Sequence, residues 1–253
     1  MQKEFASLKE KINEITNGKP VYYLANYGNW GDGLIRHGTL KFFDHIGLKY
    51  KELSIDKKDW ILPFLRGGTV IYGGGGAWCS HWNHSENYVR KLKNRFKVLV
   101  LPSSYETPYS IDNTTFYRRD EFQSKENMPQ ADFCHDMAFF IGDDFYKGPC
   151  GKGVGYFLRT DDESAKQIEI PKTNLDLSKK GNYLTDAKGF FEEINKYEVI
   201  YTDRLHVSIA GYLLKKEVHL FAGSYFKNKA VYMSSMSHAD NVHFHENYDL
   251  NQA

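Results

Sequence analysis

An arginine and a histidine follow the end of an apolar strand near the C-terminus. The stretch TDRLHVSIAGYLL (202–214) places Asp203, Arg204 and His206 where a predicted strand meets a helix. We expect Asp203 to cap this helix, with Arg204 and His206 in its first turn. A cation there is unfavourable, because the helix dipole already makes that end partly positive. Arg204 therefore needs an anion, either from the protein, with Asp203 the simplest choice, or from a bound substrate. We favour a negatively charged substrate.

A polar, glycine-rich loop follows the first predicted strand. This loop, NYGNWGDG (26–33), carries Asn26, Asn29 and Asp32 among its glycines. In parallel sheets, ligands bind where strand ends enter helices, and glycines let the backbone approach a ligand closely. The glycine spacing is not that of a dinucleotide fingerprint, and no Walker lysine follows. We predict a ligand site here; a tight strand–helix turn is the alternative.

A second loop contains four successive glycines, in YGGGGAW (72–78). Glycine loses more conformational freedom on folding than any other residue, and a simple turn needs only one or two. We therefore expect a backbone pressed against a ligand, with Gly74 and Gly75 at the contact. Trp78 would either stack on a sugar ring or pack in the core.

These loops lie in a chain in which strands alternate with helices. Apolar runs predict strands at 21–25, 49–55, 69–72, 97–102, 154–159, 198–202 and 217–222, with helical stretches between them. This alternation is typical of parallel βαβ units. We predict an α/β fold with two Rossmann-like halves, residues 1–148 and 149–253, joined near the glycine- and proline-rich segment 146–153.

Composition narrows the functional class. The chain has 253 residues, a net charge of +1 and three cysteines, so neither a disulfide framework nor a nucleic-acid surface is expected. Its first residues lack the apolar region of a signal peptide, and no apolar run is long enough to cross a bilayer. These features predict a soluble, cytoplasmic protein.

The motifs taken together resemble the polysaccharide pyruvyl transferase family. The resemblance is carried by NYGNWGDGLI, VIYGGGGAW, TDRLHVSIAGYLL and GSYFKNKAVY, with FYRRD, DMAFFI and YFLRTD in order between them. It implies a glycosyltransferase-B-like fold with a site between the halves. It also implies transfer of a pyruvyl group from phosphoenolpyruvate to two hydroxyls of a glycan, forming a ketal. No metal and no cofactor beyond the donor substrate is expected.

The implied chemistry assigns roles to particular residues. Phosphoenolpyruvate carries a phosphate and a carboxylate, and arginine grips both kinds of group bidentately. We expect His206 to be the general acid and Arg204 to act beside it. Asp32, in the opposite half, is the expected base for the acceptor hydroxyl, with Asp136 the second choice. The other donor-binding residues are expected to be Arg159, Ser224 and Lys227, and the acceptor-binding residues Asn26, Asn29, Gly74, Gly75, Trp78 and Asp136.

The expected acceptor is a glycan or lipid-linked saccharide used in capsule or exopolysaccharide synthesis. A lipid-linked acceptor would bring the protein to the inner face of the membrane. Two other functions stay open: a sugar-nucleotide glycosyltransferase on the same scaffold, and a non-catalytic glycan-binding module. The cysteine and histidines of CSHWNH (79–84) lack zinc-finger spacing, and HFHEN (243–247) is expected to be a solvated terminal segment.

Overall fold

The computed structural model describes residues 1–53, 67–80, 82, 84–161, 164 and 170–248. The chain forms two compact units, residues 1–27 with 38–140 and residues 28–37 with 141–253. The predicted division, between residues 148 and 149, lies close to where the long segment of the second unit begins. Residues 28–37, which the sequence places in the N-terminal half, group with the second unit. The two units are described separately below.

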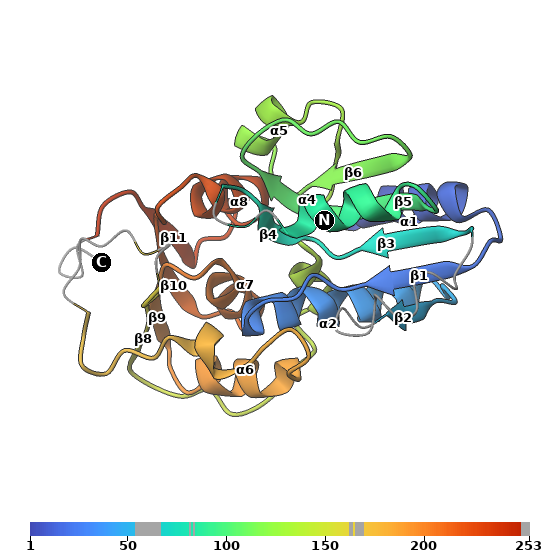
Figure 1. Cartoon of the computed structure of the whole chain (residues 1–253). Helices are drawn as coiled ribbons and strands as arrows, with labels where there is room; N and C mark the ends of the chain where they lie inside the picture. Colours follow the sequence, from blue (N-terminus) through green and yellow to red (C-terminus); the bar gives the residue numbers. More distant parts are fainter. Residues whose placement is uncertain (54–66, 81, 83, 162–163, 165–169, 249–253) are drawn as a thin grey trace. The chain divides into compact units, whose positions relative to one another are not determined.

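The first unit is built on a parallel seven-stranded sheet (Figure 1). Its strands run in the order β2-β1-β3-β5-β6-β7, and β4 pairs with β5. The bounds are β1 (Val21–Leu24), β2 (Lys51–Leu53), β3 (Thr69–Tyr72), β4 (Gly75–Trp78), β5 (Lys97–Tyr105), β6 (Thr114–Arg118) and β7 (Asp132–Phe133). The helices are α1 (Gln2–Thr16), α4 (His84–Leu92), α5 (Gln123–Asn127) and the 3-10 helix η3 (Met137–Ile141). Helix α2 (Trp30–His45) contributes its first residues to the second unit and the rest to the first.

The second unit is built on a parallel four-stranded sheet in the order β11-β10-β9-β8. Its strands are β8 (Val154–Phe157), β9 (Val199–Thr202), β10 (Glu217–Phe221) and β11 (Val242–His245). The connecting helices are η4 (Leu177–Lys180), α6 (Ala187–Asn195), α7 (Leu205–Leu213) and α8 (Lys227–Ser235). Right-handed crossovers between successive strands place their helices on one face of a sheet. Figure 1 shows α6, α7 and α8 on the same side of this sheet.

Both sheets are parallel throughout, so the predicted α/β architecture with Rossmann-like halves is confirmed. Alternation between buried β-branched strands and amphipathic helices produces it. In β3, all four residues are buried, as expected for a strand covered on both faces. In α6, Phe190, Phe191 and Ile194 recur on one face and are buried.

The glycine run has a structural explanation within the protein. A Cβ at Gly73 would lie 2.4 Å from the backbone nitrogen of Asn26, and one at Gly74 would lie 2.3 Å from the carbonyl oxygen of Pro102. Gly75 has φ 132° and belongs to β4, which pairs with β5. Close backbone contacts thus account for Gly73 and Gly74, and a positive φ accounts for Gly75.

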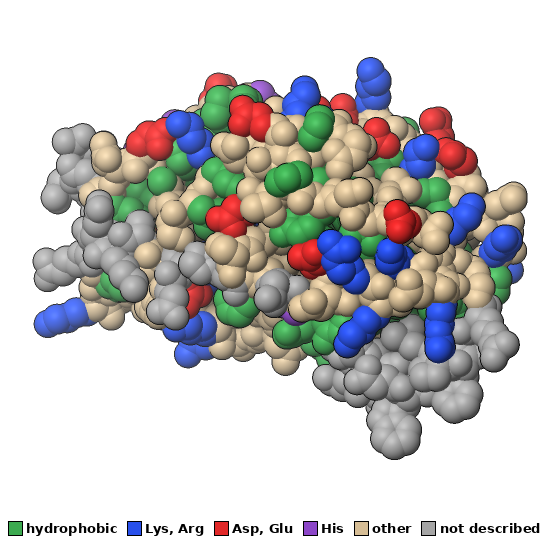
Figure 2. Space-filling view, turned by 45° about the horizontal axis from the view of Figure 1, so that its top comes forward, with side chains coloured by type: hydrophobic (Ala, Val, Ile, Leu, Met, Phe, Trp, Pro, Cys, Tyr) green, Lys and Arg blue, Asp and Glu red, His purple; other side chains and the backbone are tan. Residues whose placement is uncertain are grey.

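One local prediction also needs revision. HFHEN is not a solvated terminal segment, because His243 and His245 belong to β11 and stack with His219 of β10. The helical stretch expected between the predicted strands at 49–55 and 69–72 lies almost entirely outside the described residues. None of the described helices has both the length and the apolar composition to cross a membrane. On the face shown in Figure 2, acidic and basic side chains both occur, with hydrophobic side chains between them.

Candidate active site

Arg204 is held by two carboxylates in the second unit. Its Nε and Nη2 atoms donate to Asp176 at 3.0 and 2.7 Å, which makes a bidentate pair. Nη2 also donates to Asp161 at 2.7 Å. The Arg204 side chain is only 4% exposed, and that of Asp176 only 6%. The protein itself therefore supplies the anions that Arg204 needs, and they are not Asp203.

Arg159 shares one of these carboxylates. Its Nε and Nη2 atoms donate to the two oxygens of Asp161 at 2.8 and 3.2 Å. Asp161 thus bridges both arginines. Burial pushes the pKa of Asp161 upward, but hydrogen bonds and charge from Arg159 and Arg204 outweigh it and hold the pKa below its ordinary value. The carboxylate is ionised at neutral pH.

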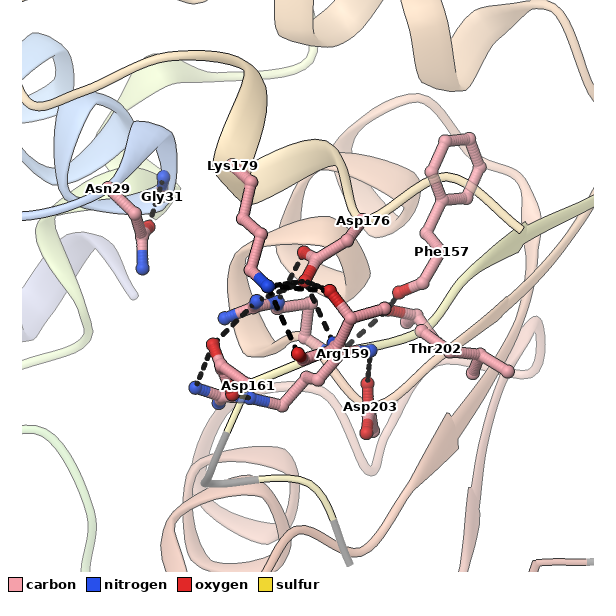
Figure 3. A network of polar contacts seen from close by, with 12 residues as sticks. Asn29, Gly31, Phe157, Arg159, Asp161, Asp176, Lys179, Thr202 and Asp203 are labelled. Carbon is pink, nitrogen blue, oxygen red and sulfur yellow. Dashed lines mark hydrogen bonds and ion pairs between the residues drawn. The ribbon is translucent and has the colours of Figure 1, made fainter. Parts of the chain in front are cut away.

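The loop after β8 and the helix η4 position this network. Asp176 precedes η4 and accepts hydrogen bonds from the backbone N–H and the hydroxyl of Thr160, both at 2.9 Å. Lys179 of η4 donates to the carbonyl of Thr160 at 3.0 Å. Figure 3 shows Asp176 and Lys179 reaching from this helix toward the strand ends that carry Arg159 and Thr202. The carboxylate facing Arg204 is therefore held by the backbone N–H and the hydroxyl of Thr160.

Asp203 does not cap α7, contrary to the prediction. The N-cap residue is Arg204. Asp203 instead accepts a hydrogen bond from the backbone N–H of Arg159 at 2.7 Å, which links the ends of β8 and β9. Thr202 holds the turn by accepting from the backbone N–H of Arg204 at 2.9 Å. Burial raises the pKa of Asp203, although the N–H bond and the nearby arginines oppose it.

His206 lies in the first turn of α7, as predicted, and is half-buried. Its imidazole lies against the start of α2. A Cβ added to Gly31 would lie 2.6 Å from Nδ1 of His206 and 3.0 Å from Oδ1 of Asn29. No side chain fits between them without movement. His206 and the glycine-rich loop are thus brought together within the second unit.

Asn29 and Asp32 form a capping box at the start of α2. The Asn29 side chain accepts from the Gly31 N–H at 2.8 Å, and Asp32 accepts from the Asn29 N–H at 3.0 Å. Gly28 has no room for a Cβ beside the Asp32 carboxylate. These contacts give both predicted ligand-binding residues a local structural role. Because residues 28–37 belong to the second unit, Asp32 and His206 lie in the same unit and not in opposite halves.

The predicted donor residues beyond the arginines lie after β10. Ser224 is exposed, and Lys227 is the first residue of α8, with its Nζ 4.9 Å from the centre of the Tyr225 ring. The buried Asn228 beside them donates to the carbonyl of Asp203 at 2.7 Å. Asn228 thereby ties the start of α8 to the turn that carries Arg204, a contact that the sequence did not predict.

Asn26 lies in the first unit, between the ends of β1 and β3. The strand order reverses there, and open α/β sheets bind ligands at such switch points. The Asn26 side-chain oxygen meets Nε2 of His84 and the hydroxyl of Tyr72, each at 3.1 Å. Burial lowers the pKa of His84. His84, a poor zinc candidate by spacing, is therefore part of a polar cluster with a predicted acceptor residue.

Trp78 and Asp136, also predicted on the acceptor side, are buried in the first unit. Trp78 is 1% exposed and packs against Tyr105 and Phe116, which favours the core-packing alternative. Asp136 is fully buried and pairs with Arg119 at 2.6 Å. The Arg119 side chain is buried with it.

Asp161 and Asp176 were missed as members of the site. Asp161 follows the arginine at the end of β8 by two residues, so the sequence did contain a signal in LRTD. Asp176 is separated from Arg204 by 28 positions, and no local pattern relates them. Among the described residues, no group of three or more His, Cys, Asp or Glu side chains is arranged to hold a metal ion.

Comparisons with known proteins identify the family and a similar fold. Residues 29–225 match the family described as polysaccharide pyruvyl transferase. A crystal structure of a functionally uncharacterised protein from Klebsiella pneumoniae subsp. pneumoniae NTUH-K2044 is similar in fold, with a TM-score of 0.81 and 24% identity. The match covers 98% of this chain and 100% of that one. No curated protein sequence matches the chain.

Proposed function

Because the chain belongs to the polysaccharide pyruvyl transferase family, we propose that it transfers a pyruvyl group from phosphoenolpyruvate to a glycan. The acceptor is a saccharide, free or lipid-linked, on the route to a surface polysaccharide such as a capsule or exopolysaccharide. The product is a pyruvate ketal that joins two hydroxyls of the acceptor. With a lipid-linked acceptor, the protein would work at the inner face of the membrane.

The observation that carries the proposal is the pair Arg159 and Arg204, both tied to Asp161, in the unit that also holds His206. Phosphoenolpyruvate presents a phosphate and a carboxylate on three carbons. Two adjacent guanidinium groups match two such anionic groups, and each can form a bidentate contact. Lys227, the first residue of α8, and Ser224, in the loop before it, add a cation and a hydroxyl for the phosphate.

The reaction needs proton transfers that the residues of the second unit can supply. C3 of the donor takes a proton, and an acceptor hydroxyl oxygen bonds to C2 as the C2=C3 double bond becomes single. The C2–O bond to phosphate then breaks, and phosphate leaves with that electron pair. A second hydroxyl bonds to C2 and closes the ketal. The two acceptor hydroxyls lose two protons in all, while C3 gains one proton and the departing phosphate gains one.

His206 is our choice for the acid that protonates C3, since an imidazole exchanges protons near neutral pH. Asp32 is the proposed base for the acceptor hydroxyl. Its hydrogen bond with the backbone N–H of Asn29 fixes the carboxylate at the start of α2. Gly31, in the same turn, lies against His206. Asn26 and Asn29 are the acceptor-binding residues that the proposal retains. Trp78, which packs in the core, and Asp136, which pairs with Arg119, are left out of it.

A phosphate-release assay tests the proposal. Purified protein is incubated with phosphoenolpyruvate and a panel of free, lipid-linked and nucleotide-linked saccharides. We expect phosphate release that depends on one class of acceptor. A parallel panel of nucleotide sugars without phosphoenolpyruvate should give no transfer. Transfer from a nucleotide sugar, or saturable glycan binding with no phosphate release from any acceptor, would contradict the proposal.

A further inference from the structure

The Asp161 carboxylate stands where two buried arginines meet. It accepts two hydrogen bonds from Arg159 and one from Arg204, at distances between 2.7 and 3.2 Å. This is the contact that a carboxylate or phosphate of a ligand makes with an arginine pair. Figure 3 shows Asp161 beside Arg159, in the same polar network as Asp176 and Lys179.

The two aspartates of the network differ in how firmly they are held. Asp176 is 6% exposed and also accepts two hydrogen bonds from Thr160. The Asp161 side chain is 32% exposed, whereas those of Arg159 and Arg204 are 8% and 4% exposed. The Asp161 carboxylate is therefore more accessible than that of Asp176 and more accessible than either guanidinium group. Asp176 is also held by the backbone N–H and the hydroxyl of Thr160, in addition to its burial.

Charge balance favours displacement of an aspartate when an anion binds. Arg159, Arg204 and Lys179 face the carboxylates of Asp161, Asp176 and Asp203. A phosphorylated acid added to this cluster would leave negative charge in excess at short range. Like charges in a partly buried site repel strongly, because water screens them poorly.

We propose that Asp161 occupies an anion subsite of the donor and is exchanged for an anionic group of the ligand. Resting on the proposed function, this makes Asp161 a specificity-determining residue. With Asp161 in place, the arginine pair is held in binding geometry and weak anions are kept out. A ligand with two anionic groups displaces the carboxylate, because its second group gains a further cation.

Isothermal titration calorimetry on the full chain tests the exchange, with phosphoenolpyruvate and inorganic phosphate as ligands. Asp161→Asn removes the competing charge and keeps the side-chain shape. We expect it to bind both ligands more tightly, by roughly tenfold, with a larger gain for inorganic phosphate than for phosphoenolpyruvate. Asp176→Asn is the contrasting variant: it loosens Arg204 and should weaken binding. Asp240→Asn, an exposed aspartate after α8, controls for the change in net charge and should leave affinity unchanged.

A second measurement covers the case in which Asp161→Asn does not fold. A crystal structure of the wild-type chain with phosphoenolpyruvate should show the Asp161 carboxylate beyond hydrogen-bond distance of Arg204. A ligand oxygen should lie in its place. A complex in which Asp161 keeps its 2.7 Å contact with Arg204 would overturn the inference. Unchanged or weaker anion binding by Asp161→Asn would overturn it as well.

The outcomes separate this inference from the proposed function. Tighter phosphate binding by Asp161→Asn, together with no turnover of phosphoenolpyruvate by any variant, would support the anion subsite. It would refute the proposal that phosphoenolpyruvate is the donor. Normal turnover of phosphoenolpyruvate by the wild-type chain, together with no gain in anion affinity in Asp161→Asn, would support phosphoenolpyruvate as the donor. It would refute the exchange of the Asp161 carboxylate for a ligand anion.

Discussion

Gly31 lies directly against the imidazole of His206, with no room for a methyl group between them. A Cβ at Gly31 would stand 2.6 Å from Nδ1 of the histidine. Gly31 has no positive φ, so alanine is compatible with its backbone, and the clash with His206 is the main effect. Gly31→Ala should therefore displace the imidazole.

We predict that Gly31→Ala lowers turnover by about 10²-fold, since displacing a catalytic group by about 1 Å costs that much. Steady-state phosphate release from phosphoenolpyruvate measures the effect. Gly189→Ala, in α6, is the matched control; its Cβ would meet only the ring of Trp30 at 3.2 Å. Equal turnover in the two variants would show that the position of His206 is unimportant.

Substitution of His206 tests its role as general acid. His206→Gln keeps a polar side chain of similar size but cannot exchange a proton near neutral pH. We expect turnover to fall by about 10²–10⁴-fold, with the affinity for phosphoenolpyruvate and the thermal midpoint close to those of the wild type. Turnover within a few-fold of the wild type would exclude His206 from the proton transfers.

Asp32 can be tested as a base separately from its role in the capping box. Asp32→Ala removes the acceptor of the Asn29 N–H and should cost about 0.5–2 kcal/mol in the free energy of unfolding. Asp32→Asn retains an oxygen for that bond but is not basic. We expect Asp32→Asn to unfold near the wild-type midpoint while losing about 10²–10⁴-fold in turnover. If Asp32→Asn is active, Asp32 is not the base and its role is limited to capping α2.

Arg119 and Asp136 should behave as a structural pair. Asp136→Ala leaves the Arg119 guanidinium buried without its carboxylate, which typically costs about 3–5 kcal/mol in the free energy of unfolding. Urea denaturation measures the loss. The calorimetric affinity of the folded variant for phosphoenolpyruvate should not change. A stable Asp136→Ala variant with impaired turnover would restore Asp136 as a candidate base.

The buried carboxylate of Asp203 predicts a pH-dependent change in stability. Its pKa is raised in the folded state, mainly by burial. The contribution of this carboxyl group to the free energy of unfolding is therefore fully present below the ordinary Asp pKa of about 3.9. It is lost as pH rises through the folded-state pKa. Asp203→Asn is neutral at every pH and keeps an acceptor for the Arg159 N–H.

Relative to the wild type, Asp203→Asn should therefore unfold at a higher temperature at pH 7. The difference should shrink as pH falls toward 4. Thermal unfolding monitored by circular dichroism at several pH values gives the comparison. A variant that is less stable at pH 7 would mean that the charge of Asp203 stabilises the arginine cluster more than its burial costs.

Local sequence patterns were sufficient to predict the architecture. Strands such as 69–72 and 198–202 are apolar runs that end in polar loops, and each lies where it was predicted. The placement of Arg204 and His206 at the start of α7 followed from the same pattern. Such features depend on residues close together in the chain, so they can be read without knowledge of the tertiary structure.

Contacts between distant residues could not be read in this way. The glycines at 73 and 74 suggested a ligand, but the backbone of neighbouring strands takes up their space. Asp176 reaches Arg204 only because η4 folds back onto the ends of β8 and β9. The composition of 26–33 indicated a functional loop. Nothing in it indicated that the loop groups with the second unit rather than with the strand it follows.

The most direct test of the account follows the methylene carbon of the donor into the product. Phosphoenolpyruvate labelled with ¹³C at C3 is incubated with the protein and its acceptor saccharide, and the isolated saccharide is examined by NMR. We predict that the label appears as a methyl group on a quaternary ketal carbon bonded to two sugar oxygens. A label retained as a vinyl methylene, or recovered only in free pyruvate with no incorporation into the saccharide, would contradict ketal-forming transfer.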